Sequence, residues 1–242
     1  MLFVNADDLG RTKEVTDRIL TCFHHKKINS ASMMTFMIDS ERAADLARTN
    51  KLPRGLHINF DQNLTSLTTP EKLRYHHQAV SDYLKTRKWN QVLYNPFLRN
   101  SFDYVFQAQW DEFSRLYDAA PIRLDGHHHM HLCINMLLSG KIPKGIRVRR
   151  NFTFRHGEKH PVNLLYRYLI DSWLKSRFLC TDFFYSIAPI DIERIKEIVA
   201  ISKSRDVEIM VHPGVESEYS FLLSPEWADL ISKSISSPIL PT

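Results

Sequence analysis

Short apolar runs alternate along the chain with segments in which apolar residues recur every three or four positions. The first run, residues 2–6, is followed by a segment at 12–27 with helical spacing, where Thr12 is the predicted N-cap. Similar runs predict strands at 30–37, 55–60, 121–128, 146–150, 183–188 and 207–214. Helical spacing predicts further helices at 40–49, 102–117, 133–139, 162–176, 191–204 and 225–236.

Strands that alternate with helices are typical of a parallel sheet. About seven such units in 242 residues favour an α/β barrel over an open sheet, and we treat residues 1–242 as one domain. The pattern weakens between 61 and 99, where one or two helices are mixed with loop. We interpret this segment as an insertion that covers a substrate cleft.

The composition, 43% apolar and 24% charged, is that of an ordinary globular protein. The net charge of +5 fits an anionic substrate, although a scattered basic surface is the favoured explanation. The basic residues at 144–150 lie in a strand pattern, so we expect no nucleic-acid partner. The three cysteines, in no metal-binding spacing, predict free thiols, and the absence of a leader or a long apolar segment predicts a cytoplasmic protein without a membrane span. The sequence does not determine the oligomeric state, so a homo-oligomer is possible.

Carboxylates and imidazoles stand where four predicted strands end. They are Asp7 with Asp8, His57, the run 125–131, and His212. The carboxyl ends of parallel strands meet at one face, which carries the site in such folds. One carboxylate and two imidazoles can hold a catalytic divalent ion with positions open for water and a substrate oxygen. A second carboxylate could then accept the water's proton, and another histidine could protonate a leaving group.

Each of these segments also has a simpler explanation when it is taken alone. The two aspartates could cap a helix or lie in a solvated turn, and His57 could be a core histidine. His212 could shape a turn, and the histidine run could be a surface loop or bind metal adventitiously. Their coincidence at four strand ends favours a joint site.

The alternation of side chains along a strand sorts the histidine run only in part. His127 and His129 would point to one side and His128 to the other, so either His127 or His129 could be a ligand. We expect the loss of His128 to matter least. The same alternation separates Asp7 from Asp8 unless the strand bends before Gly10, and we expect that bend.

Four ordered motifs, NADDLG (5–10), GLH (55–57), DGHHHMH (125–131) and HPG (212–214), resemble those of the YdjC-like carbohydrate deacetylases. The resemblance implies a distorted TIM-like (β/α) barrel. It also implies metal-dependent removal of the N-acetyl group from an acetylated amino sugar or oligosaccharide, with release of acetate. N-acetylglucosamine-containing compounds are the expected substrates.

The resemblance also implies roles for single residues. Asp8, His57 and His127 would bind one divalent ion, zinc or magnesium. Asp7 would act as the general base, and His212 as the acid that protonates the departing amine.

Other candidates lie near the predicted centre. Asp125 would orient an imidazole of the histidine run or cap a helix. His129, Arg147 and Arg149 are candidates for contacts behind the metal or with the substrate, while the roles of His128 and His131 stay unassigned.

Where relatives often have an acidic residue after the strand at 146–150, this chain has Asn151 and Phe152. In the insertion, the aromatic residues Tyr83, Trp89 and Tyr94 could stack on a sugar, although core packing is favoured for them.

Two rival functions use the same donors. A metal-dependent phosphoesterase or sugar isomerase would suit one carboxylate and two imidazoles, and two ions per chain would favour the phosphoesterase. A sugar-binding protein without catalysis would need neither Asp7 nor His212, so the presence of both argues against it.

Overall fold

The computed structural model describes residues 1–154 and 157–232 and contains a seven-stranded parallel sheet, in the order β5-β4-β3-β2-β1-β7-β6. The strands are β1 (Leu2–Leu9), β2 (Ser30–Met33), β3 (Arg54–Ile58), β4 (Arg123–Gly126), β5 (Arg147–Val148), β6 (Phe183–Ser186) and β7 (Val207–Val211). Each of them lies within or overlaps a strand predicted from the apolar runs.

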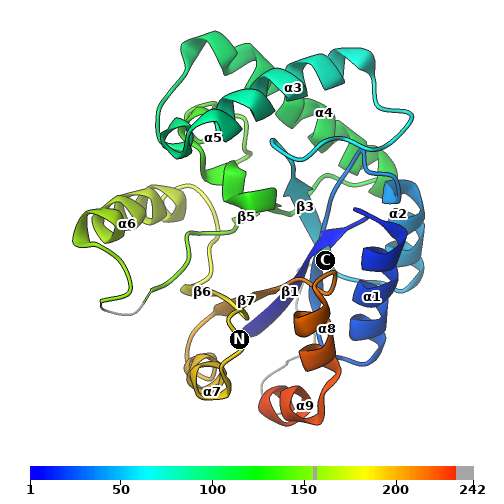
Figure 1. Ribbon diagram of the computed structural model, residues 1–242, viewed down its shortest axis with the longest axis vertical. Coiled ribbons are helices and arrows are strands. Elements are labelled where there is room, and N and C mark those ends of the chain that lie inside the picture. The colour runs from blue at the N-terminus through cyan, green and yellow to red at the C-terminus, as the bar shows by residue number, and fades with distance from the viewer. Residues whose placement is uncertain (155–156, 233–242) are drawn as a thin grey trace.

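The sheet is curled into a half-barrel but is not closed (Figure 1). Among the described residues, its edge strands β5 and β6 share no ladder. The two edges are linked instead by an isolated bridge between Arg147 and Leu179, which precedes β6, and by a hydrogen bond from the Thr153 N–H to the Phe184 carbonyl, 2.8 Å long. After β5 the N–H of Asn151 donates to the Asp171 side chain instead of a strand. The predicted barrel is therefore correct only as a barrel-like, open sheet.

Helices pack around this sheet, with α3 and α4 together at one end and α6 to one side (Figure 1). They are α1 (Lys13–His24), α2 (Ser40–Thr49), α3 (Glu71–Thr86), α4 (Arg99–Tyr117), α5 (Ile134–Leu137), α6 (Pro161–Lys175), α7 (Ile192–Ile201), α8 (Glu216–Leu223) and α9 (Pro225–Ile231). Short 3-10 helices are η1 (Lys88–Gln91), η2 (Pro96–Leu98) and η3 (His127–Leu132). Of these, α8 was not predicted, and residues 233–236 of the predicted last helix lie outside the described residues.

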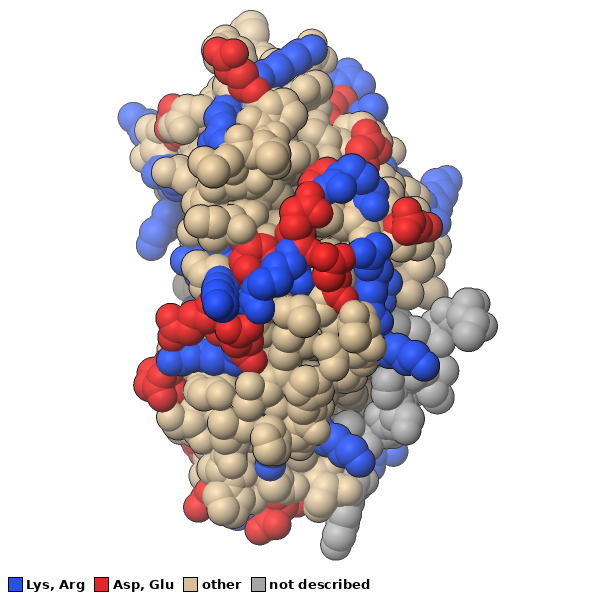
Figure 2. Space-filling model, turned by 90° about the vertical axis from the view of Figure 1, so that its right-hand side faces the viewer, with Lys and Arg blue, Asp and Glu red and all other residues tan. Residues whose placement is uncertain are grey.

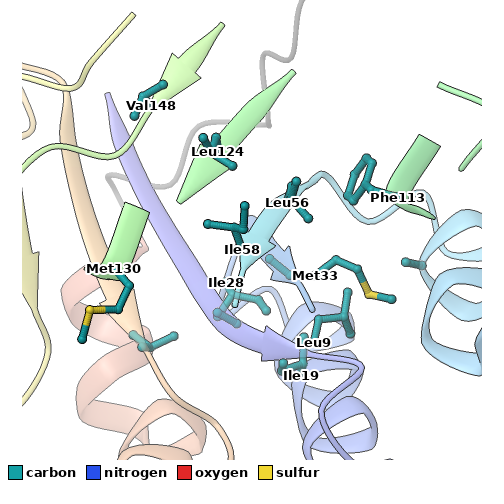
Figure 3. Close-up of a cluster of buried hydrophobic side chains, with 14 of the residues drawn as sticks. Leu9, Ile19, Ile28, Met33, Leu56, Ile58, Phe113, Leu124, Met130 and Val148 are labelled. Atoms are coloured by element: carbon teal, nitrogen blue, oxygen red, sulfur yellow. The ribbon is translucent and has the colours of Figure 1, made fainter. Parts of the chain in front are cut away.

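Local sequence signals explain the first strand-helix unit. The Thr12 side chain accepts the Val15 N–H at the start of α1, as predicted for an N-cap. The helix then buries Ile19 and Cys22 against the sheet. Figure 3 shows apolar side chains of neighbouring strands in this core, for example Leu56 of β3 and Leu124 of β4. Burial of such side chains is the main term that holds the sheet and its helices together.

The segment 61–99 is more regular than its sequence predicts, because α3 buries Leu73, Val80 and Leu84 against the rest of the fold. Tyr83 also packs on the core, as expected. Trp89 does not, because 73% of its surface is exposed. Core packing is therefore the wrong explanation for Trp89.

The remaining composition-based expectations concern cysteines and charge. All three cysteines are free, two of them buried. On the face in Figure 2 acidic and basic side chains are intermixed, which agrees with a scattered rather than gathered positive charge on that face. In the described part of the chain no helix combines the length and apolar character of a membrane span.

Candidate metal centre and adjoining cleft

Both aspartates of the first motif lie against the same imidazole, that of His57. The Asp8 backbone has a φ of +73°, and the pairing of β1 with β2 shifts register between Ala6 and Leu9. Such a left-handed residue breaks the side-chain alternation of a strand, and aspartate tolerates it better than most residues. The predicted bend is thus confirmed, and it falls inside β1.

Asp8, His57 and His127 offer three ligand atoms within 4.8 Å of one another. The Asp8 Oδ1 lies 3.3 Å from the His57 Nε2 and 3.0 Å from the His127 Nδ1. In a tetrahedral zinc site with bonds of about 2.1 Å, neighbouring ligand atoms are roughly 3.4 Å apart. The donor atoms and their spacing therefore fit a divalent ion.

Asp125 holds His57 in the orientation that such an ion requires. Its Oδ1 accepts the His57 Nδ1–H at 2.7 Å, so the other ring nitrogen faces Asp8. A carboxylate that fixes the outer nitrogen of a ligand histidine is a recurrent feature of metal sites. The predicted orienting role of Asp125 has geometric support, but the ring concerned is His57 and not one of the histidine run.

The surrounding carboxylates favour positive charge at His57. Burial alone would lower the pKa of this ring, but the charge of Asp7 and the bonds with Asp125 and Asp8 outweigh it and raise the pKa to about 10. A divalent ion at Nε2 would supply the same positive charge in place of the proton.

Arg149 ties Asp7 to the rest of the buried charges. Its guanidinium donates to both Asp7 oxygens, at 2.6 and 2.7 Å, and lies 3.1 Å from Asp125 and 2.7 Å from Glu208. Burial would raise the pKa of Asp7, but the charges of Arg149 and His57 outweigh it and lower that pKa. Asp7 is therefore an oriented carboxylate that stays ionised at neutral pH.

The two arginines predicted for the site, Arg147 and Arg149, lie in different surroundings. Arg149 enters the site, whereas the Arg147 guanidinium lies over the Phe3 ring, 4.9 Å from its centroid. Among the described contacts, none joins Arg147 to the metal centre. Their positions along the chain explain this difference, because Arg147 begins β5 whereas Arg149 directly follows its carboxyl end.

The histidine run does not continue the strand. β4 ends at Gly126, and His128 and His129 adopt φ values of +49° and +60° within η3. The alternation assumed from the sequence therefore does not apply. His128, expected to point away, lies with its ring centroid 4.0 Å from that of His127, at a tilt of 38°, and donates from Nδ1 to the Asp61 Oδ2 at 2.7 Å.

The last two histidines of the run have supporting positions. His129 packs edge-on against Phe152, with ring centroids 4.5 Å apart. His131 is buried and donates from Nε2 to the Arg149 carbonyl at 2.9 Å, so it fixes the backbone that carries Arg149. Burial lowers the pKa of His131 to about 4 and keeps the ring neutral.

His212 follows β7 at the same end of the sheet. Burial would lower its pKa, but Glu218, 3.7 Å from the His212 Nδ1, together with the charges of Asp7 and Asp8, raises it. The Glu218 carboxylate also accepts the His212 backbone N–H at 2.6 Å. His212 is thus held and favoured in its protonated form, as a proton donor needs to be.

A cavity of about 760 Å³ adjoins the histidine run. It reaches from η1 to α6, and its lining includes His128, His129, Trp89, Tyr166 and Arg167. Aromatic and hydrogen-bonding side chains of this kind suit a sugar ring. The segment 61–99 contributes to the lining through residues 89, 91 and 92.

Sequence reasoning missed four charged residues around the centre. They are Asp61, Arg123, Glu208 and Glu218. Glu208 and Arg123 interrupt otherwise apolar strand patterns, which is a usable signal for a buried ion pair. Asp61 directly follows a predicted strand, as the recognised donors do. Glu218 follows the HPG motif with no comparable signal.

Comparisons with known proteins agree with this arrangement. The family model for YdjC-like proteins matches residues 1–233. A carbohydrate deacetylase of Danio rerio is 28% identical over 54% of this chain and 42% of its own length. A chitooligosaccharide deacetylase of Yersinia pestis is 27% identical over 54% of this chain and 51% of its own length. The chain thus spans about half the length of the curated relatives it matches.

A solved structure shares the fold. An Enterococcus faecalis protein, described as a candidate cellobiose-phosphate cleavage protein, superposes with a TM-score of 0.67 over 96% of this chain and 94% of its own, at 19% identity. That identity supports the fold alone. The family match over residues 1–233 shows that the chain belongs to the YdjC-like family.

Proposed function

We propose that this protein is a metal-dependent hydrolase that removes the N-acetyl group from an acetylated amino sugar or oligosaccharide and releases acetate. The observation that carries the proposal is the position of Asp7 and His212 beside the donor set Asp8, His57 and His127. The names of the two relatives, a carbohydrate deacetylase and a chitooligosaccharide deacetylase, support the same reaction.

The chemistry of amide hydrolysis explains why these residues are needed. An amide is a poor electrophile with a poor leaving group. When bound, one zinc or magnesium ion at Asp8, His57 and His127 acts as a Lewis acid that polarises a carbonyl and acidifies water. Asp7, ionised and held by Arg149, accepts the proton of the attacking water. His212 donates a proton to the nitrogen that leaves as the amine.

The substrate is proposed to enter through the cavity between η1 and α6, with the acetyl group toward the donor set. The exposed Trp89 offers a face for stacking on a sugar ring. Asn151 and Arg167, which bond each other at 3.2 Å, offer hydrogen-bonding groups beside it.

The test measures acetate release from N-acetylglucosamine, chitooligosaccharides and a nucleotide-linked N-acetyl sugar. Chelation should abolish release, and zinc or magnesium should restore it. Asp7→Asn should lower kcat by roughly 100-fold or more while the metal is retained, because it removes the base. His127→Ala should lose the metal itself.

His25→Gln, at an exposed position remote from the site, is the matched control. A phosphate ester and a free ketose or aldose in the same panel test the rival phosphoesterase and isomerase. Acetate release that is unchanged in both Asp7→Asn and His127→Ala would refute the proposed mechanism.

A further inference from the structure

Asp61 is a buried carboxylate next to the metal centre that the proposed reaction does not use. It lies just after β3 and is 4% exposed. Its Oδ2 accepts the His128 Nδ1–H, while its Oδ1 is buried with no hydrogen-bond partner among the described residues. Among the described residues, the one ion-pair partner of the Asp61 carboxylate is His128.

The other buried carboxylates of the site are better compensated. Asp7 and Asp125 each pair with Arg149, and Asp8 pairs with Arg11 at 3.1 Å. A buried charge without such a partner is costly, so a bound cation near Asp61 would remove an unfavourable term.

His127 presents a second unsatisfied atom at the same place. Its Nδ1 is engaged by Asp8, and its Nε2 is buried with no hydrogen-bond partner among the described residues. Asp61, His127 and His128 together offer three ligand atoms within 4.8 Å of one another. The side chain of His128 is 61% exposed and borders the cavity, so an ion can reach this group from solvent.

We propose that Asp61, His127 and His128 form a second divalent cation site, beside the site of Asp8, His57 and His127. The His127 ring is shared, with Nδ1 serving the first ion and Nε2 the second. A ring that binds at both nitrogens gives up its N–H proton to solvent and becomes an imidazolate. The His128 Nδ1 gives up its proton to solvent or to its own Nε2, and its bond with Asp61 is replaced by bonds of both residues to the ion.

The donor set determines which ion fits. Two imidazoles and one carboxylate suit zinc, whereas magnesium prefers oxygen ligands. The second site should bind more weakly than the first, because His128 is exposed and the shared ring must lose a proton. Zinc should therefore bind in two steps, the first tighter than the second.

The experiment titrates the metal-free full-length chain with Zn²⁺ and counts bound zinc by equilibrium dialysis and elemental analysis. The wild type should bind two ions per chain. Asp61→Asn and His128→Gln should each bind one, with the affinity of the first step retained. That retained step shows that the variants are folded. The control His25→Gln should bind two.

Binding of one zinc by the wild type, or of two by both Asp61→Asn and His128→Gln, would overturn the second site. The second site does not depend on the proposed deacetylase function, and different results would refute each of these two proposals. One bound zinc with acetate release refutes only the second site. Two bound zinc ions without acetate release from any substrate of the panel support the second site and count against the deacetylase.

Discussion

At the scale of single residues, the chemistry at the strand ends could be predicted from sequence, but the pairing of the charges behind it could not. Asp7, Asp8, His57 and His127 were predicted and lie together. Their supports depend on distant partners: Arg149 is 142 residues from Asp7 and 59 from Glu208. A sequence pattern shows that a charge interrupts a strand but not which charge it meets.

Glu208 illustrates how strongly these supports should contribute to stability. This side chain is 3% exposed and accepts bonds from Arg123 and Arg149, so its removal leaves two buried guanidinium groups with less compensation. We expect Glu208→Gln to lower the free energy of unfolding by roughly 3 kcal/mol. Urea unfolding monitored by fluorescence measures this loss.

The matched control is Glu193→Gln, which changes the same residue type in an exposed pair with Lys196. Its effect should stay within about 0.5 kcal/mol of the wild type, as for most surface pairs. An equally small effect of Glu208→Gln would show that the buried network does not depend on this carboxylate.

At the scale of elements, periodicity predicted the long and regular pieces best. The bounds of α2 agree with prediction because Ala43, Ala44 and Ala47 form a clear buried stripe. The short helix α8 was missed, since its apolar residues 219 and 221–223 follow no single stripe. The course of residues 127–132 was also missed, because nothing in a run of histidines signals two left-handed residues.

The missed helix α8 matters for catalysis, because it carries Glu218. The pKa of His212 is raised largely through this carboxylate. A proton donor is active while protonated, so turnover should fall as pH rises through the pKa of His212, above the ordinary value of 6.5. Glu218→Gln should lower that pKa and move the alkaline fall of kcat to lower pH.

Profiles of kcat against pH for the wild type and Glu218→Gln, with the metal saturating, test this expectation. Glu216→Gln changes a neighbouring, exposed glutamate of the same helix that pairs with Arg18, and it serves as the control. An alkaline midpoint that is the same in all three proteins would show that His212 is not the group whose ionisation limits turnover.

At the scale of the whole molecule, the alternation of strands and helices predicted a parallel α/β fold with seven strands, and the structure has them. Closure of the sheet was not predictable, because it depends on whether β5, only two residues long, meets β6. The many imidazoles, twelve in the chain, have a further global consequence. Several of these rings are buried in the neutral form, so the free energy of unfolding depends on pH.

Burial lowers the pKa of four histidines, which are His77, His127, His129 and His131. For His77 and His131 the pKa is lowered to about 4. The folded chain keeps these rings neutral where the unfolded chain, with pKa values near 6.5, takes up protons. Between about pH 6.5 and pH 4 the unfolded state therefore binds more protons than the folded state, and the free energy of unfolding falls as pH falls.

His77→Gln removes one of the groups that take up a proton on unfolding. It should therefore make this fall in stability shallower by up to about 1.4 kcal/mol per pH unit. Urea unfolding of the chelator-treated protein at several pH values in this range measures both slopes, with the exposed His25→Gln as the control. A slope in His77→Gln as steep as that of the wild type would mean that His77 is protonated in the folded chain, contrary to its burial.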